Sequence, residues 1–284
     1  MLTRIASIAK PMTAIAILQL FEAGQLNIDS PIQEYLPDFP IKPEGTITVR
    51  HLLNHSSGIA AYQNEAEIEN QIAYDSIKDA IDIFKDRALI AVPGTAFNYT
   101  TYGYVVLGRI IETVSGQSYE IYIKQNIWDV AGMTNTGIER RDKSYENKSE
   151  LYHRNDRGKI ETATPNNLSD RIPGGGFYST LDDMMKFGNA ILDNVFISKE
   201  SLEIMFEIPN IENSALPYGL GWYFYDDIPN YGSVYGHPGA QTGASTMFMM
   251  LPEQDFFVIV LSNTSRASNE VLTIAARLFE IAGG

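Results

Sequence analysis

Residues 4–24 read RIASIAKPMTAIAILQLFEAG and join a serine–lysine pair to a long apolar run. Between Met12 and Leu26 apolar side chains lie on nearly every side of a helix, which predicts a helix buried all round. Pro11 lacks an N–H group and fits only a first turn, so the helix begins close to Ser7 and Lys10. We therefore expect Ser7 at a helix N-terminus inside the core, where free N–H groups stabilise negative charge.

The totals describe a globular chain that is large enough for one large domain or two. It has 284 residues, of which 44% are apolar. A net charge of −14 would repel nucleic acid and anionic membrane surfaces. The absence of cysteine excludes disulfides and thiolate sites. No stretch predicts a membrane span, and the N-terminus lacks the pattern of a signal peptide. We expect a cytoplasmic chain as written, or one that has lost a leader.

The end of the chain changes to strand patterns, and a helix follows them. The predicted strands are GLGWYFY, SVYG, ASTMFMML and FFVIVLS, and the helix buries Val271, Ile274, Leu278 and Phe279. Before them, residues 48–90 and 104–114 predict helices, with Thr48 as a cap and Gly116 as a stop. Residues 137–172 predict a surface excursion.

These patterns predict an α/β (α+β) fold in which an antiparallel sheet lies between N- and C-terminal helices. Residues 1–40 and 200–284 are expected to form a discontinuous sheet domain, and residues 41–199 a mainly helical domain. Ligand sites tend to lie along such a seam between domains.

The pair Ser7 and Lys10 has the spacing of a nucleophile and its base. An S-x-x-K motif occurs about once by chance in a chain of this length. On a helix, however, residues three apart face the same way, so a neutral Lys10 can take the Ser7 proton, and burial lowers a lysine pKa. The alternative is that Ser7 only caps the helix while Lys10 extends to solvent.

Two further segments carry candidate site residues. Tyr99, at the head of the helix at 104–114, can relay a proton if a cation such as Lys10 favours its phenolate. The alternative is that it simply buries its ring. In the segment 236–240, GHPGA, a glycine lets a substrate backbone approach, and a strand N–H can join that of Ser7 as an oxyanion donor.

His51 and His55 stand four residues apart on one predicted helix, a spacing that can bind zinc. Leu52 occupies the position where a metalloprotease carries its glutamate, and no third ligand is near, so we favour a structural role. No G-x-S-x-G, P-loop or G-x-G-x-x-G motif occurs. The sequence predicts a site without metal or cofactor.

Taken together, the motifs resemble the serine β-lactamase and penicillin-binding protein superfamily, in particular the class C related branch with the mitochondrial serine β-lactamase-like proteins and their bacterial relatives. The matching phrases are RIASIAK, FEAGQLNIDSPIQEYLPDFP, ITVRHLLNHSSGI, PGTAFNYTTYGYVVLG, GGGFYSTLDDMMKFGNAIL, YGLGW and GHPGAQTGASTMFMMLPEQDFFVIVLSN. The resemblance implies that Ser7 is acylated, that Lys10 is its base and that Tyr99 is the proton relay. The N–H groups of Ser7 and Ala240 become the oxyanion hole.

The chain departs from this family at three places. Thr101 replaces the asparagine of Tyr-x-Asn, which loses an amide that helps to hold substrate and lysine. His237-Pro238-Gly239 replaces Lys-Thr-Gly, so a mostly neutral group stands where the family has a cation. The family also has two strands before the serine helix, whereas six residues precede Ser7 here. We expect these strands to be missing and the sheet edge to be open, so either the chain is a fragment or a second copy of it covers the edge.

The leading hypothesis is a serine hydrolase that forms an acyl-enzyme on an ester or peptide bond. The weaker carboxylate anchor at His237 and Gly239 favours these substrates over penicillins. A true β-lactamase or penicillin-binding carboxypeptidase is the alternative within the enzyme class. From another class, the alternative is a catalytically impaired binding or assembly protein with the same fold.

Overall fold

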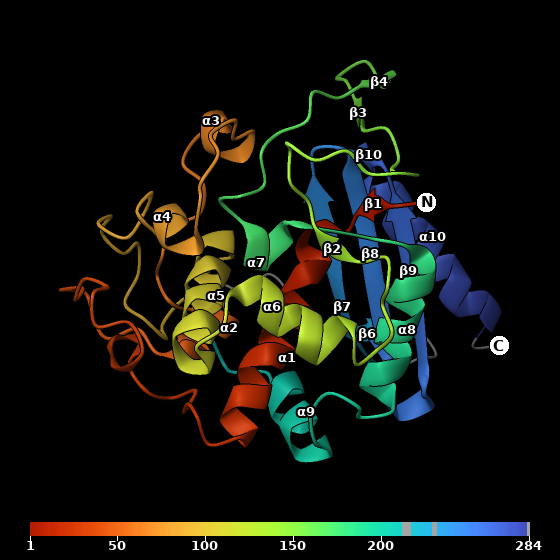
Figure 1. Ribbon diagram of the computed structural model, residues 1–284. Coiled ribbons are helices and arrows are strands. Elements are labelled where there is room, and N and C mark those ends of the chain that lie inside the picture. Colours follow the sequence, from red (N-terminus) through yellow and green to blue (C-terminus); the bar gives the residue numbers. More distant parts are fainter. Residues whose placement is uncertain (212–216, 229–231, 283–284) are drawn as a thin grey trace.

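The central sheet of the computed structural model is antiparallel, with the strand order β6-β7-β8-β9 (Figure 1). The structure describes residues 1–211, 217–228 and 232–282. The strands span Tyr223–Ile228 (β6), Gly232–Gln241 (β7), Ala244–Leu251 (β8) and Phe256–Ser262 (β9). The predicted α+β fold is confirmed, because the strands follow the four alternating or apolar runs of the sequence.

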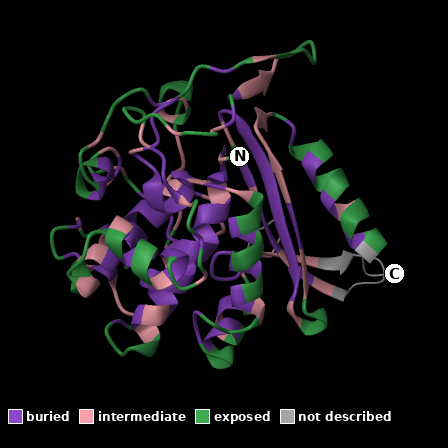
Figure 2. Cartoon of the chain, turned by 45° about the vertical axis from the view of Figure 1, so that its right-hand side comes forward, coloured by how far each residue is buried: buried purple, intermediate pink, exposed green. Residues whose placement is uncertain are grey.

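Helices cover both faces of this sheet. Helix α10, Ser268–Ala282, packs on one face through Val271, Ala275 and Phe279 (Figures 1 and 2). Val271 and Phe279 match the expected inner face, whereas Ile274 and Leu278 are 48% and 40% exposed. On the other face, Figure 2 shows the remaining helices gathered around a buried centre. That centre is the start of the chain.

Residues 6–22 form a turn and a helix that are buried over most of their length at the centre of the molecule. A 3-10 turn, Ala6–Ile8, leads into helix α1, Ala9–Glu22. Every residue of α1 up to Leu18 is buried, which confirms the expected helix without a polar face. Because α1 carries no solvent-exposed stripe over these residues, its stability comes from tertiary packing.

The helices around α1 are mostly short. Those after α1 are α2 (Val49–Leu53), α3 (Glu65–Ile68), α4 (Ile77–Ile81), α5 (Thr101–Ser115), α6 (Tyr119–Ile123), α7 (Ile172–Gly175), α8 (Leu181–Leu192) and α9 (Lys199–Phe206). Single turns lie at Ile32–Glu34 (η2), Lys124–Trp128 (η3) and Pro252–Gln254 (η4). The helix expected at 104–114 is confirmed, and Gly116 ends it in a left-handed conformation. The prediction of helix throughout 48–90 is wrong, because only three helices of four or five residues form there.

Two small sheets flank the central one. The first has the order β1-β5-β2, formed by Thr3–Arg4, Phe177–Ser179 and Gly137–Ile138. The second has the order β10-β3-β4, formed by Thr264–Ser265, Tyr152–Arg154 and Ile160–Thr162. Residues 137–172 are therefore not the simple surface excursion that was expected, because several of their polar side chains are buried.

Arg4 joins four distant segments in the interior. Its guanidinium is 0% exposed and donates to both carboxylate oxygens of Glu139. It also donates to the Asn166 side chain at 2.7 Å and to the Thr242 carbonyl at 2.8 Å. A buried ion pair is stabilising only while both partners and their remaining hydrogen bonds are present.

We expect Arg4→Ala to lower the free energy of unfolding by about 3–5 kcal/mol, because it leaves the buried Glu139 carboxylate without its main partner. Urea denaturation followed by circular dichroism measures this change. Lys159→Ala, at a side chain that is 74% exposed, is the control and should shift the midpoint little. An unchanged midpoint for Arg4→Ala would contradict the role given to this cluster.

Candidate active site

Ser7 lies in the 3-10 turn that precedes α1. The turn begins at Ala6, whose φ of +49° is in the left-handed region that non-glycine residues adopt rarely. The Ser7 side chain is partly exposed and makes no capping hydrogen bond to the turn or to α1. The alternative of a simple helix cap is therefore wrong, and the hydroxyl is left for other partners.

Lys10 is fully buried, so the alternative of a lysine that extends to solvent is wrong as well. Its amine nitrogen lies 2.7 Å from the Gly174 carbonyl and 3.2 Å from the hydroxyls of Ser7 and Thr101. A neutral amine has two N–H donors and one lone pair, which matches these three neighbours. Gly174 only accepts and Thr101 can accept, so the lone pair is available to the Ser7 hydroxyl.

The electrostatics of the site favour the neutral amine. Burial, and then the positive charge of Arg171, lower the pKa of Lys10 well below its ordinary value. Arg171 is itself buried, donates to Asp170 and lies over the Tyr62 ring. The Lys10 amine thus has the position and the lowered pKa expected of a candidate general base for Ser7.

Tyr99 faces the same serine from the other side. Its phenol lies close enough to the Ser7 hydroxyl for the serine to act on its pKa, and its ring lies 4.9 Å from the Lys10 amine. Burial and the neighbouring Tyr223 raise the pKa of Tyr99 well above its ordinary value. The condition set for a phenolate, a cationic neighbour, is not met, because the lowered pKa of Lys10 favours its neutral form and desolvation disfavours the charged phenolate. Tyr99 therefore faces Ser7 as a proton-bearing phenol.

Strand β7 approaches the Ser7 turn at Gly239. A Cβ on this glycine would lie 2.1 Å from the Thr246 hydroxyl, 2.7 Å from the Ile5 carbonyl and 3.0 Å from the Ala6 Cβ. The expected reason for this glycine, room for a substrate backbone, is wrong at this atom, since the chain itself fills the space. The next residue, Ala240, is exposed beside the turn.

His237 is buried and points away from solvent. Its Nδ1 lies 2.7 Å from the Pro238 carbonyl, which can only accept, so Nδ1 carries the proton. Nε2 then accepts from the Tyr218 hydroxyl at 3.0 Å. Burial, and then Lys10, lower the pKa of His237 to about 3. The imidazole is thus uncharged at neutral pH, as the sequence predicts.

His51 and His55 do not form a metal pair. Helix α2 ends at Leu53, and His55 follows with a φ of +58°, so the expectation that both lie on one helix is wrong. His51 completes the N-terminal cap with Thr48, whereas the His55 ring packs on Tyr99. Among residues 1–211, 217–228 and 232–282, no group of three potential ligands is close enough to hold a metal ion.

Sequence reasoning missed Arg171, Gly174 and the packing role of His55. Gly174 and Arg171 lie in or beside the polar stretch that has no helical or strand periodicity, and their contacts with Lys10 span more than 160 residues. The triple glycine at 174–176 was the available signal. A Cβ at Gly174 would lie 2.6 Å from the Thr101 methyl group and 3.4 Å from the Lys10 amine.

A hollow of about 340 Å³, lined by apolar side chains together with Asn210, opens beside the catalytic candidates. Its walls include Phe97, Ile208, Ile211, Pro217 and Tyr218. The Tyr218 ring also lies 6.4 Å from that of Tyr99, which places the hollow next to the site.

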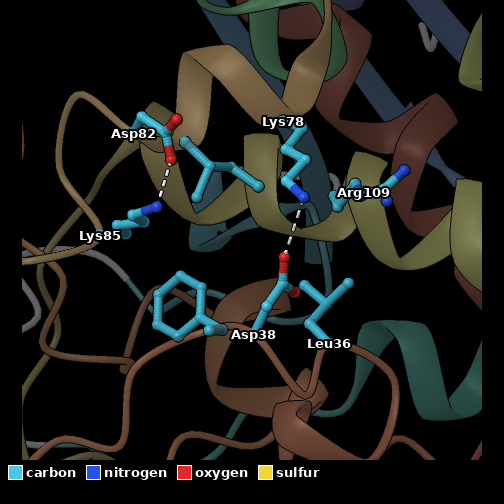
Figure 3. Close-up of a pocket in the computed structure, with 8 residues that line it drawn as sticks. Leu36, Asp38, Lys78, Asp82, Lys85 and Arg109 are labelled. Carbon is cyan, nitrogen blue, oxygen red and sulfur yellow. Dashed lines mark ion pairs between the residues drawn. The ribbon is translucent and has the colours of Figure 1, made fainter.

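A second hollow, shown in Figure 3, lies elsewhere, between the segment 36–39 that follows η2 and helix α4. Its ion pairs Lys78–Asp38 and Lys85–Asp82 are partly or largely exposed, and its volume is only about 20 Å³. It has room for about one water molecule and contains none of the candidate residues.

Comparisons with known proteins identify the family of this chain. The family model "Beta-lactamase" matches residues 1–282. "Serine beta-lactamase-like protein LACTB, mitochondrial" of Homo sapiens is 27% identical over 88% of this chain and 62% of its own length. "Penicillin-binding protein 4*" of Bacillus subtilis is 32% identical over 92% of this chain and 60% of its own. The chain thus spans about three fifths of these curated relatives.

Among solved structures, a "D-stereospecific amidohydrolase from Streptomyces sp." superposes with a TM-score of 0.84 and 25% sequence identity. The match covers 100% of this chain and 87% of the other. In the described part of this chain, no helix is long and apolar enough to cross a membrane.

We expect Lys10→Met to slow covalent labelling of Ser7 by a fluorophosphonate about 10²–10⁴-fold, because methionine keeps the bulk and removes the base. In the unmodified chain the labelling rate should rise with pH as Lys10 loses its proton, and it should level off below pH 10.5, since the Lys10 pKa is lowered. Intact-mass spectrometry over a pH series measures both effects. Labelling of Lys10→Met at the unmodified rate would contradict the assignment.

Proposed function

Because the chain belongs to the beta-lactamase family, we propose that it is a serine hydrolase that forms an acyl-enzyme on Ser7 and cleaves an ester or peptide bond. The observation that carries this proposal is the position of the buried Lys10 amine nitrogen, 3.2 Å from the Ser7 oxygen. A lysine in this position has two properties of a general base: it reaches the serine hydroxyl, and its lowered pKa favours the neutral amine that can accept a proton.

In the proposed first step, Lys10 takes the Ser7 proton while the serine oxygen attacks the substrate carbonyl carbon. The carbonyl oxygen gains the negative charge, and the backbone N–H groups of Ser7 and Ala240 stabilise it. When the bond to the leaving group breaks, the proton returns from Lys10 to that group, with the Tyr99 phenol as relay. Water then attacks the ester on Ser7 by the reverse proton path and frees the acid.

Thr101 and Gly174 have supporting parts in this proposal. Both accept hydrogen bonds from the Lys10 amine, so they orient its lone pair toward Ser7. The Thr101 hydroxyl thereby takes over the contact with lysine that the amide of the family motif makes, although it reaches less far toward a substrate.

The substrate class follows from His237 and the hollow beside it. His237 is neutral and already bonded to Tyr218 and Pro238, so it offers no charge to a carboxylate. The neighbouring walls at Phe97 and Ile208 are apolar. We propose esters and amides with an uncharged, apolar group at this end, in preference to penicillins, which carry a carboxylate.

A catalytically impaired assembly protein remains the candidate from another class. It is supported by β9, which among the described residues pairs only with β8 and leaves its outer edge open. Open edges favour pairing with a second copy of a chain. The hydrolase is preferred, because an impaired site has no need of a buried lysine aimed at a serine.

The first test is the intact mass after exposure to a fluorophosphonate, with peptide mapping. We expect one adduct on Ser7, none on Ser7→Ala, and a loss of ester turnover of at least about 10³-fold in that variant. A folded unmodified chain that takes no adduct, or a Ser7→Ala variant with full turnover, would overturn the proposal.

For substrate choice, we expect kcat/KM for a neutral nitrophenyl ester with an apolar acyl group to exceed that for a chromogenic cephalosporin at least about 10-fold. The physical reason is the missing cation at His237. Steady-state absorbance assays under identical buffer conditions provide the comparison. The reverse order of the two substrates would favour a true β-lactamase.

A further inference from the structure

His55 occupies an unusual place directly behind Tyr99. It follows the end of α2 with a φ of +58°, and its side chain is fully buried. The centre of its ring lies 4.3 Å from that of Tyr99, 4.7 Å from that of Tyr218 and 5.2 Å from that of Tyr104. The histidine thus packs inside a cluster of aromatic rings that includes Tyr99.

Two hydrogen bonds to His55 hold the chain on both sides of Tyr99. The backbone N–H of Asn98 donates to the His55 carbonyl at 2.8 Å. The backbone N–H of Thr100 donates to the His55 Nδ1 at 3.3 Å. Since the residues before and after Tyr99 are both fixed to one histidine, the direction of the Tyr99 side chain depends on that histidine.

The hydrogen bond from Thr100 sets the protonation state of His55. Nδ1 must present a lone pair to an N–H group, so the proton resides on Nε2. A second proton on Nδ1 would place two donors face to face. Burial, followed by Lys10 and His237, lowers the pKa of His55 well below its ordinary value, and the other titratable groups around the ring are the phenols of Tyr99, Tyr104 and Tyr218.

Packing alone does not account for a histidine here. In the described part of the chain, the buried Nε2 has no hydrogen-bond partner. An unpaired buried N–H costs about 1–3 kcal/mol, which an apolar ring of the same shape would avoid. The feature that an apolar ring lacks is the acceptor at Nδ1, and that acceptor serves the backbone beside Tyr99.

We propose that His55 is a positioning residue that holds the Tyr99 phenol against Ser7 through its Nδ1 acceptor. This inference rests on the proposed hydrolase function. It concerns the rate of the chemical step, because a displaced proton relay slows proton transfer without removing a contact to the substrate. An error of about 1 Å in such a group can cost about 10²-fold in rate.

Two substitutions separate the acceptor from the ring. His55→Phe keeps an aromatic ring against Tyr99 and removes the acceptor, so kcat for ester hydrolysis should fall about 10–100-fold with KM within about 3-fold. His55→Asn loses the ring, but its Oδ1 stands in the position of Nδ1, and asparagine tolerates a positive φ. It should keep kcat within about 3-fold of the unmodified chain.

His51→Asn is the matched control, because it makes the same substitution at the histidine of the α2 cap. It should leave kcat and KM unchanged. Thermal unfolding of each variant accompanies the kinetics. A His55→Phe variant that folds and keeps full kcat overturns the proposal, and so does an equal loss of kcat in His55→Asn and His55→Phe.

Histidine-selective ¹⁵N NMR of the unmodified chain tests the same contact without a substitution. An unprotonated Nδ1 in His55 between about pH 5 and pH 8 supports the proposal. A proton on Nδ1 overturns the proposal. This result decides the question even if the His55→Phe variant does not fold. The fluorophosphonate experiment distinguishes failure of the hydrolase proposal from failure of the His55 proposal. A chain that forms no adduct on Ser7 contradicts the hydrolase. A chain that forms the adduct, but whose kcat does not change when His55 is substituted, contradicts only the positioning role.

Discussion

The burial of one amine is the constraint on which the rest of the site depends. Lys10 lies on the first turn of a helix that has no exposed face there, so its nitrogen can meet only groups that the fold provides. These groups come from three parts of the chain, at Ser7, Thr101 and Gly174. Desolvation makes the neutral amine favourable, and the Thr101 hydroxyl and the Gly174 carbonyl can accept its two N–H groups. Folding and chemical reactivity therefore have a common cause in this chain.

Much of the architecture could be predicted from local patterns. The four strands and the helix α5 follow apolar periodicity, which each segment carries within itself. The segment at 48–90 could not be predicted in this way. Its apolar residues suit a helix, but a chain that must wrap over Tyr99 and Tyr102 breaks into short turns. There, His55 and Ala60 bond to Asn98 and Thr100 rather than to their own helix.

The site residues fall into the same two groups: some lie in local sequence motifs, and others are brought together only by the fold. Ser7, Lys10 and Tyr99 stand in motifs whose spacing carries their chemistry, so the sequence indicates them. Arg4 and Arg171 act through partners more than a hundred residues away, and only the folded chain brings them together. The sequence also could not show why position 239 requires a glycine, because the atoms that fill the space beside it belong to Thr246 and to the Ser7 turn.

The cluster of phenols and imidazoles around the nucleophile also sets limits on the solution conditions in which the fold persists. Burial raises the pKa of Tyr99 and Tyr218, so above about pH 10 the unfolded chain releases protons that the folded chain keeps, and folding loses free energy. Burial lowers the pKa of His55 and His237. Below about pH 6.5 the unfolded chain therefore binds protons that the folded chain does not bind, and folding loses free energy. The same packing that aligns the reactive groups thus confines the native state between an acid and an alkaline boundary.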